Sequence, residues 1–151
     1  MFRITQSFLL NSFVGFLREK QWQVLYEDYV DGPRSGKGAQ GVLCSCFKVI
    51  FDQFPDLVAA KGDDMLIIEV DLAFKSQYVK KLKLFKSKET DLLRCVNSSL
   101  HLDINSVNLG MVFQRKPNPA QTKELQGLDV WLYNINSSKF FHLNTTVSRS
   151  F

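Results

Sequence analysis

The sequence predicts one mixed α/β domain in which helices pack on a central mixed sheet. The chain has 151 residues, of which 45% are apolar, enough to bury a single core. Apolar residues recur at helical spacing in two segments, whereas several shorter segments are β-branched or alternate in polarity. Helices and strands interleaved in this way favour an α+β or mixed α/β sandwich. No internal repeat divides the chain, so we expect one domain over residues 1–151.

The first part of the chain predicts a helix, a strand and a loop. Residues 5–20 carry one apolar stripe that includes Phe8, Phe13 and Leu17, which predicts a helix. Residues 21–29 alternate in polarity and predict a strand. The following loop, 31–41, contains four glycines and a proline.

The middle and end of the chain predict one long helix among further strands. Residues 42–54 favour a strand, or a short helix followed by a strand. A long helix is predicted from about Ser76 to residue 96. The remaining predicted elements are a strand over 106–114, a short helix near 120–125, a strand over 128–135 and its hairpin partner over 139–143, followed by a polar tail to the end.

Residues 57–70 predict a tight antiparallel hairpin. Two apolar runs, 57–60 and 65–70, are separated by a short polar connection that contains Gly62. If the loop is Gly62-Asp63, Asp56 lies directly opposite Glu69, with Cβ atoms about 4.5–5.5 Å apart. The hairpin therefore carries acidic side chains where one strand ends and the other begins.

Acidic residues on this hairpin are the candidate chemical centre. Strand alternation places Asp71 on the same face as Glu69, so we expect three carboxylates, including Asp56, to converge. Carboxylates held together in a poorly solvated place either raise their pKa values or bind a cation. An all-oxygen site suits Mg²⁺ or Mn²⁺. The alternative is a surface hairpin whose acids are solvated.

The order Pro55-Asp56, twelve residues, then Glu69-Val70-Asp71 resembles the PD-(D/E)XK nuclease superfamily. The resemblance implies a restriction-endonuclease-like core over about residues 5–135, followed by a C-terminal hairpin and tail over 128–151. It implies that Asp56 and Glu69 bind Mg²⁺ or Mn²⁺ for phosphodiester hydrolysis, with Asp71 as a further ligand or a neighbouring acid. Many members carry another metal-binding acid near the first helix, for which Glu19, Glu27 and Asp28 are all candidates.

The family's motif lysine is replaced by Asp71 in this sequence. Some members, such as viral cap-snatching endonucleases, supply the lysine from the following helix, and the resemblance then implies Lys81 or Lys75 as the catalytic lysine. Further cations on that helix or in the loop are candidates for binding a nucleic-acid backbone: Lys80, Lys83, Lys86, Arg34 and Lys37. The alternatives are a solvated helix face and a plain linker.

We therefore expect a metal-dependent nuclease that acts on DNA or RNA. The alternative is a catalytically silent domain of this fold that binds nucleic acid or serves as a subunit of a larger assembly. A homodimer or larger complex remains open. The discriminating feature is whether a lysine of the predicted long helix reaches the hairpin acids.

Cysteine usage and hydropathy bear on the setting of the chain. Three cysteines, Cys44, Cys46 and Cys95, are an odd number in a chain large enough to fold without disulfides, which favours a reducing, intracellular setting. Their spacing does not match a zinc site. No apolar run approaches the roughly 20 residues that cross a bilayer, so we expect no membrane partner.

Overall fold

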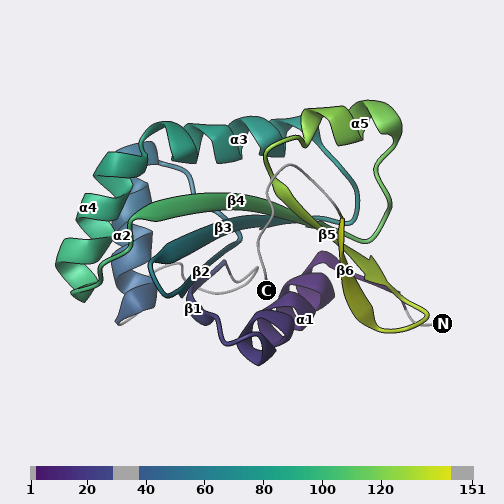
Figure 1. Ribbon diagram of the computed structural model, residues 1–151, viewed down its shortest axis with the longest axis horizontal. Coiled ribbons are helices and arrows are strands. Elements are labelled where there is room, and N and C mark those ends of the chain that lie inside the picture. Colours follow the sequence, from purple (N-terminus) through teal and green to yellow (C-terminus); the bar gives the residue numbers. More distant parts are fainter. Residues whose placement is uncertain (1–2, 29–37, 144–151) are drawn as a thin grey trace.

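The computed structural model describes residues 3–28 and 38–143, which form a mixed α/β protein (Figure 1). Its six-stranded mixed sheet has the strands in sequence order, and five helices cover it. The first three strands are antiparallel, the third, fourth and fifth are parallel, and the sixth is antiparallel to the fifth. The predicted mixed class is confirmed.

The strands fall where alternation and β-branched runs placed them, except that none lies in 42–54. They are β1 (Gln23–Glu27), β2 (Leu57–Lys61), β3 (Asp64–Val70), β4 (Ser106–Phe113), β5 (Asp129–Asn134) and β6 (Lys139–Leu143). From Met65 to Val70, β3 is buried throughout, as expected for a central strand covered on both faces. At Gly110 of β4, an added Cβ would lie 2.7 Å from the Trp131 ring, so the missing side chain lets the indole lie against the strand.

Helix α1 (Gln6–Glu19) covers one face of the sheet (Figure 1). The Thr5 hydroxyl caps it by accepting a hydrogen bond from the Phe8 N–H at 3.0 Å, which satisfies one of the unpaired amides of the first turn. Its apolar stripe lies against the sheet, where Phe13 is fully buried and its ring lies 5.1 Å from that of Trp131. The predicted first helix is confirmed.

The other face is covered by α2 (Ala39–Phe51), α3 (Ser76–Ser87), α4 (Glu89–Leu100) and α5 (Pro119–Glu124). Helix α2 corrects the prediction of a strand, or of a short helix and a strand, over 42–54. Leu43 and Phe47 are four residues apart and both fully buried, whereas Val49 is 81% exposed. That pattern is a helical stripe, which the aromatic and β-branched composition obscured.

The single helix predicted from Ser76 to residue 96 is instead two helices, which meet at Lys88 with φ −118° and ψ 35°. Contacts to β4 hold this junction. The Glu89 carboxylate accepts a hydrogen bond from the Val107 N–H at 2.8 Å, and the Lys86 ammonium donates to the Val107 carbonyl at 2.7 Å. Helical spacing alone could not reveal the break, because Val107, which Lys86 and Glu89 contact, lies on a strand that is distant in the sequence.

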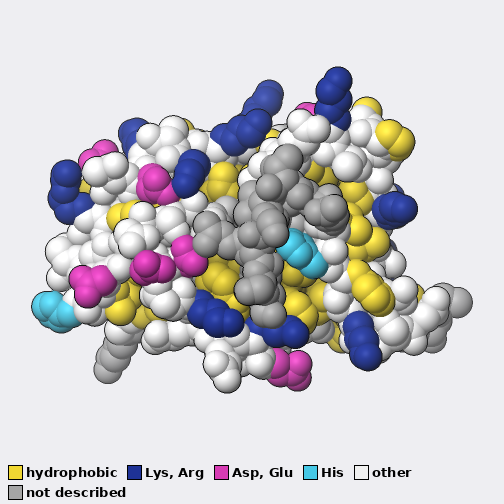
Figure 2. All heavy atoms as spheres, in the orientation of Figure 1, with side chains coloured by type: hydrophobic (Ala, Val, Ile, Leu, Met, Phe, Trp, Pro, Cys, Tyr) yellow, Lys and Arg dark blue, Asp and Glu magenta, His cyan; other side chains and the backbone are white. Residues whose placement is uncertain are grey.

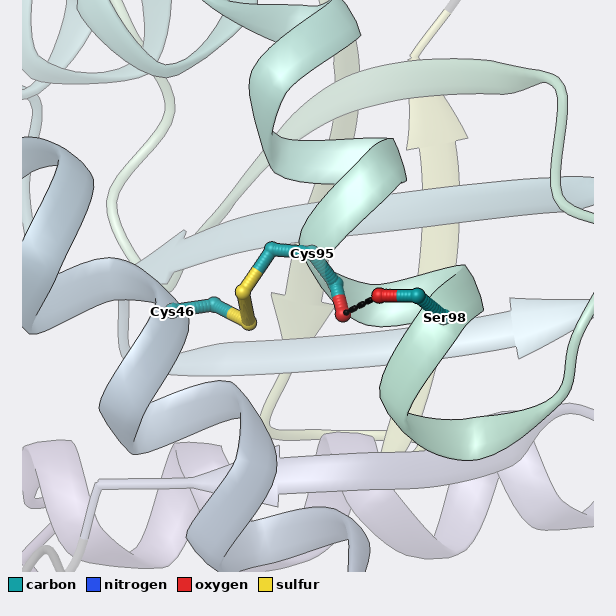
Figure 3. Close-up of a disulfide and its surroundings, with 3 residues drawn as sticks. All are labelled: Cys46, Cys95 and Ser98. Atoms are coloured by element: carbon teal, nitrogen blue, oxygen red, sulfur yellow. Dashed lines mark hydrogen bonds between the residues drawn. A yellow bond between two sulfur atoms is a disulfide. The ribbon is translucent and has the colours of Figure 1, made fainter.

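Helices α2 and α4 lie side by side and are joined by a disulfide between Cys46 and Cys95 (Figure 3). Their Cα atoms are 6.0 Å apart, and the Ser98 hydroxyl donates to the Cys95 carbonyl at 3.2 Å. Cys44 is the free thiol. Two of the three cysteines are therefore paired, contrary to what their odd number indicated.

Within residues 3–28 and 38–143, no helix is long and apolar enough to cross a bilayer.

Candidate functional site

The β2–β3 hairpin has the register that the sequence predicted. Leu57 pairs with Ile68 and Lys61 pairs with Asp64, leaving Gly62 and Asp63 as the loop. Gly62 has φ +61°, a left-handed conformation in which a residue without Cβ is favoured. One step beyond Leu57 and Ile68, Asp56 comes opposite Glu69, as expected.

Asp56 and Glu69 form a tightly connected acidic pair. The Asp56 N–H donates to Glu69 Oε2 at 3.1 Å, and the Val70 N–H donates to Asp56 Oδ2 at 2.8 Å. These two bonds hold the carboxyl groups of Asp56 and Glu69 side by side at the end of the hairpin. Strand alternation explains their shared face: Ile68 and Val70 pack on the α1 side, so Glu69 between them points to the side of α2 to α5.

Glu69 is 1% exposed, and this burial is the main cause that raises its pKa to about 9. Removing a carboxylate from water penalises its charged form. The charge of Asp56 and the hydrogen bond between the acids raise the pKa further, while Lys81 lowers it. Near neutral pH the pair therefore retains a proton in the absence of another cation.

Lys81 of α3 reaches this pair. Its Nζ lies 2.5 Å from Glu69 Oε1, and its side chain is 23% exposed. The helix is fixed over the sheet by Val79, Leu82 and Phe85, which are buried at helical spacing. Because Lys81 lies between these anchors, the packing of α3 directs its ammonium to the acids.

Asp71 does not join a three-ligand group. In the described part of the chain, no three His, Cys, Asp or Glu side chains are arranged to hold one ion, so the expected convergence of three carboxylates is not observed there. Asp71 Oδ2 instead lies 3.0 Å from Lys75 Nζ. Burial, and to a lesser extent the neighbouring Asp71 carboxylate, raise the pKa of Tyr78.

A cavity of about 380 Å³ opens beside Lys81. Its lining residues come from the end of β1, the segment before β2 and the first turns of α3: Asp28, Gln53, Phe54, Gln77, Tyr78 and Lys81. The Asp28 N–H donates to the Asp56 carbonyl at 2.9 Å, which ties this wall to the acidic pair. Gln53 and Phe54 were missed by the sequence argument, because only their position directly before Pro55-Asp56 signals a role.

The other candidate acids near the first helix lie elsewhere. Glu27 forms an ion pair with Arg18 of α1 at 3.6 Å. Glu19 lines a groove of about 660 Å³ between α1 and the β5–β6 hairpin, away from the acidic pair. Of the three candidates, only Asp28 lines the cavity beside Lys81.

The basic residues of α3 separate into two groups. Lys80 and Lys83 are exposed, and Figure 2 shows Lys and Arg side chains projecting along the edge where α3 and α5 lie. Lys86 is held by Glu89 at 2.6 Å and by the Val107 carbonyl, so its contacts are structural. Arg34 and Lys37 lie outside the described residues.

Comparisons with family models, with curated proteins and with solved structures find no match to this chain.

Proposed function

We propose that this chain is a metal-dependent nuclease that hydrolyses phosphodiester bonds in DNA or RNA, in the manner of the PD-(D/E)XK enzymes. The observation that carries the proposal is the meeting of three groups: Asp56 and Glu69, joined by the hydrogen bond from the Asp56 N–H to Glu69 Oε2, and Lys81 Nζ at 2.5 Å from Glu69 Oε1. An acidic pair with a lysine beside it is the chemistry that the motif implies.

The order of elements supports the proposal. A helix precedes three antiparallel strands, and the helices after β3 lead into a strand parallel to it. This arrangement is the one expected for a restriction-endonuclease-like core, with one extra helix, α2, between β1 and β2. The acids lie at the end of the hairpin, and the cavity beside Lys81 is lined by Gln53, Phe54 and the first turns of α3.

The donor set fits a hard divalent cation such as Mg²⁺ or Mn²⁺. Carboxylate oxygens are the ligands these ions prefer, and Mg²⁺ is often held by one or two carboxylates while water and phosphate oxygens supply the rest. Glu69 Oε1 is buried, with Lys81 Nζ beside it at 2.5 Å. Asp56 and Glu69 would hold the ion.

A bound cation would lower the pKa of an attacking water and polarise the scissile phosphate. The residues of the chain orient the ligands and supply a positive charge. The backbone amides of Asp56 and Val70 orient the two carboxylates. The Lys81 ammonium supplies a positive charge next to the centre, where negative charge builds up on a phosphate in the transition state.

A catalytically silent domain that binds nucleic acid is the second candidate, and two observations favour it. Asp71 stands where the motif has lysine. In addition, the Lys81 ammonium already lies on Glu69 and neutralises part of the charge that would attract a metal. In this alternative the lysines of α3 bind a phosphate backbone and no bond is broken.

The test is cleavage of single-stranded and duplex DNA and RNA in Mg²⁺, in Mn²⁺ and in chelator. Asp56→Asn, Glu69→Gln and Lys81→Met keep the approximate shapes of the side chains while removing their charges. We expect each to lower the metal-dependent rate by at least about 10²-fold, since each removes electrostatic stabilisation of the transition state. Asp52→Asn is the matched control, because Asp52 is an exposed acid that pairs with Lys48 on α2.

The outcomes separate the two candidates. Metal-dependent cleavage that persists in both Asp56→Asn and Glu69→Gln would show that the acidic pair is not the active centre. Retained binding without cleavage in any metal would favour the silent domain. Loss of cleavage in Asp52→Asn as well would point to damage to the fold, which thermal unfolding of each variant would reveal.

A further inference from the structure

Asp71 is a buried acid that organises its neighbours. It is 8% exposed, and its Oδ1 accepts a hydrogen bond from the Leu72 N–H at 2.7 Å. Its Oδ2 lies 3.0 Å from the Lys75 ammonium. A buried carboxylate without a cation beside it is costly, so the burial of Asp71 favours keeping the Lys75 ammonium in contact with it.

Lys75 is paired with Asp71 and is also accessible to solvent. Its side chain is 52% exposed although its Nζ lies on Asp71, and an ammonium has three N–H donors. The Nζ also lies 5.7 Å from the centroid of the Tyr78 ring. The Lys75 ammonium therefore lies between the Asp71 carboxylate and the face of the Tyr78 ring.

This group lies next to the proposed active centre. Asp71 directly follows the last residue of β3 and is two residues beyond Glu69, a separation of about 7 Å along an extended chain. Tyr78 lines the cavity together with Lys81. The Ser76 hydroxyl does not belong to this group, because it donates to Glu124 at 3.1 Å.

We propose that Lys75 binds a backbone phosphate next to the scissile one, and that Asp71 is a positioning residue that holds Lys75 for this contact. The inference rests on the proposed function, of which it names the contact to the substrate. It also explains the departure from the motif, since the acid at the motif lysine position holds a lysine four residues further along the chain. Lys81 acts at the acidic pair and Lys75 acts on the neighbouring phosphate.

Whether removing the charge of Asp71 tightens or weakens binding of nucleic acid tests the proposal. If Asp71 were only a negative charge near the substrate, removing it would tighten the binding of a polyanion. If Asp71 were a metal ligand, removing it would weaken binding of the metal. If it positions Lys75, removing its charge weakens binding of nucleic acid in the absence of any metal.

The experiment measures binding of labelled single-stranded and duplex oligonucleotides, of DNA and of RNA, in chelator between about 50 and 200 mM salt. We expect Lys75→Met to weaken binding roughly three- to ten-fold at low salt. It should also make the slope of log K against log salt shallower by about 0.7 for single strands or about 0.9 for duplexes, the loss of one phosphate contact. Asp71→Asn should weaken binding in the same direction, and the double variant should lose little more than Lys75→Met alone.

Three controls accompany this series. Lys75→Arg should keep the wild-type slope. Lys88→Ala removes a cation about 20 Å away at the other end of α3, and it should change binding much less. Mn²⁺ affinity should stay within about two-fold in Asp71→Asn but fall in Glu69→Gln, because Glu69, unlike Asp71, is a proposed ligand.

Each outcome separates this inference from the proposed function. Wild-type binding with an unchanged slope in Lys75→Met, or tighter binding by Asp71→Asn, would overturn the role of the pair and leave the nuclease proposal intact. A large loss of Mn²⁺ affinity in Asp71→Asn would assign Asp71 to the metal instead. A wild-type protein that neither binds nor cleaves nucleic acid would overturn both.

Discussion

Glu69 brings two opposing influences together in one side chain. Its burial and the neighbouring Asp56 favour the protonated carboxyl, while Lys81 favours the carboxylate. A buried acid whose counterion lies on only one oxygen is costly for folding. The net effect of these influences on the pKa of Glu69 can be measured without knowing the substrate.

The metal-free protein should lose stability as the pH rises, owing to Glu69. Because the pKa of Glu69 is about 9 in the folded protein and the ordinary value of a glutamate is about 4.5, the folded state binds an extra proton between these pH values. The free energy of unfolding should therefore fall from about pH 5 to about pH 9, with a slope of at most roughly 1.4 kcal/mol per pH unit from this group. Urea unfolding in chelator at several pH values measures it.

Glu69→Gln is the matched variant, since an amide of the same shape does not titrate. The difference in unfolding free energy between wild type and Glu69→Gln isolates the contribution of this carboxyl from that of other acids. It should change steadily in favour of the variant as the pH rises. A difference that is constant from pH 5 to pH 9 would contradict a raised pKa.

Among the elements, α2 and α4 depend on each other. They pack together over the end of the sheet and share the Cys46–Cys95 disulfide, which closes a chain segment with a sequence separation of 49 residues. The junction between α3 and α4 is held by the hydrogen bonds of Glu89 and Lys86 with Val107 of β4. Contacts between distant elements, rather than local helix propensity, set the positions of these helices.

Reducing the disulfide should destabilise the protein without unfolding α3. A cross-link of this length restricts the unfolded chain by about 4 kcal/mol in the chain-entropy model, which is the expected loss in the free energy of unfolding. Chemical unfolding with and without a reductant measures the loss. The stability of Cys44→Ser should respond to the reductant as the wild type does, because Cys44 is outside the bridge.

Equal stability of the wild type in oxidising and reducing buffer would contradict this prediction. A Cys46→Ser/Cys95→Ser variant provides a second measure, because it should match the reduced wild type and should no longer respond to the reductant.

At the scale of the whole molecule, the sheet separates two apolar cores. One contains α1 together with Trp22 and Trp131, and the other contains α2 to α4 with Phe47 and Phe85. Strands β2 and β3 contribute side chains to both, by alternation. The two cores should therefore unfold together.

A cavity made in one core should lower the stability of both cores. Phe47→Ala should lower the free energy of unfolding by about 3–5 kcal/mol, because Phe47 is fully buried. Both tryptophans of the chain lie in the α1 core, so their fluorescence reports on the side opposite Phe47. We expect the fluorescence and circular dichroism transitions to shift together in urea, with Phe13→Ala as the matched variant on the α1 side. Separate midpoints for the two signals would show two independently unfolding parts.

The sequence by itself determined the order of most elements and the register of the hairpin. Both depend on short-range patterns: the spacing of Phe8, Phe13 and Leu17, and a two-residue loop at Gly62 and Asp63 that sets Asp56 against Glu69. It could not distinguish helix from strand in α2, because aromatic and β-branched residues such as Phe47 and Ile50 occur in both.

Only the tertiary structure decided which lysine meets which acid, which cysteines pair and where the long helix breaks. Lys75 and Lys81 are both near enough in sequence, but the packing of α3 places Lys81 on Glu69 and Lys75 on Asp71. These contacts join elements that are distant in the chain or whose relative rotation is free until the core packs. Local spacing carries no information about that rotation.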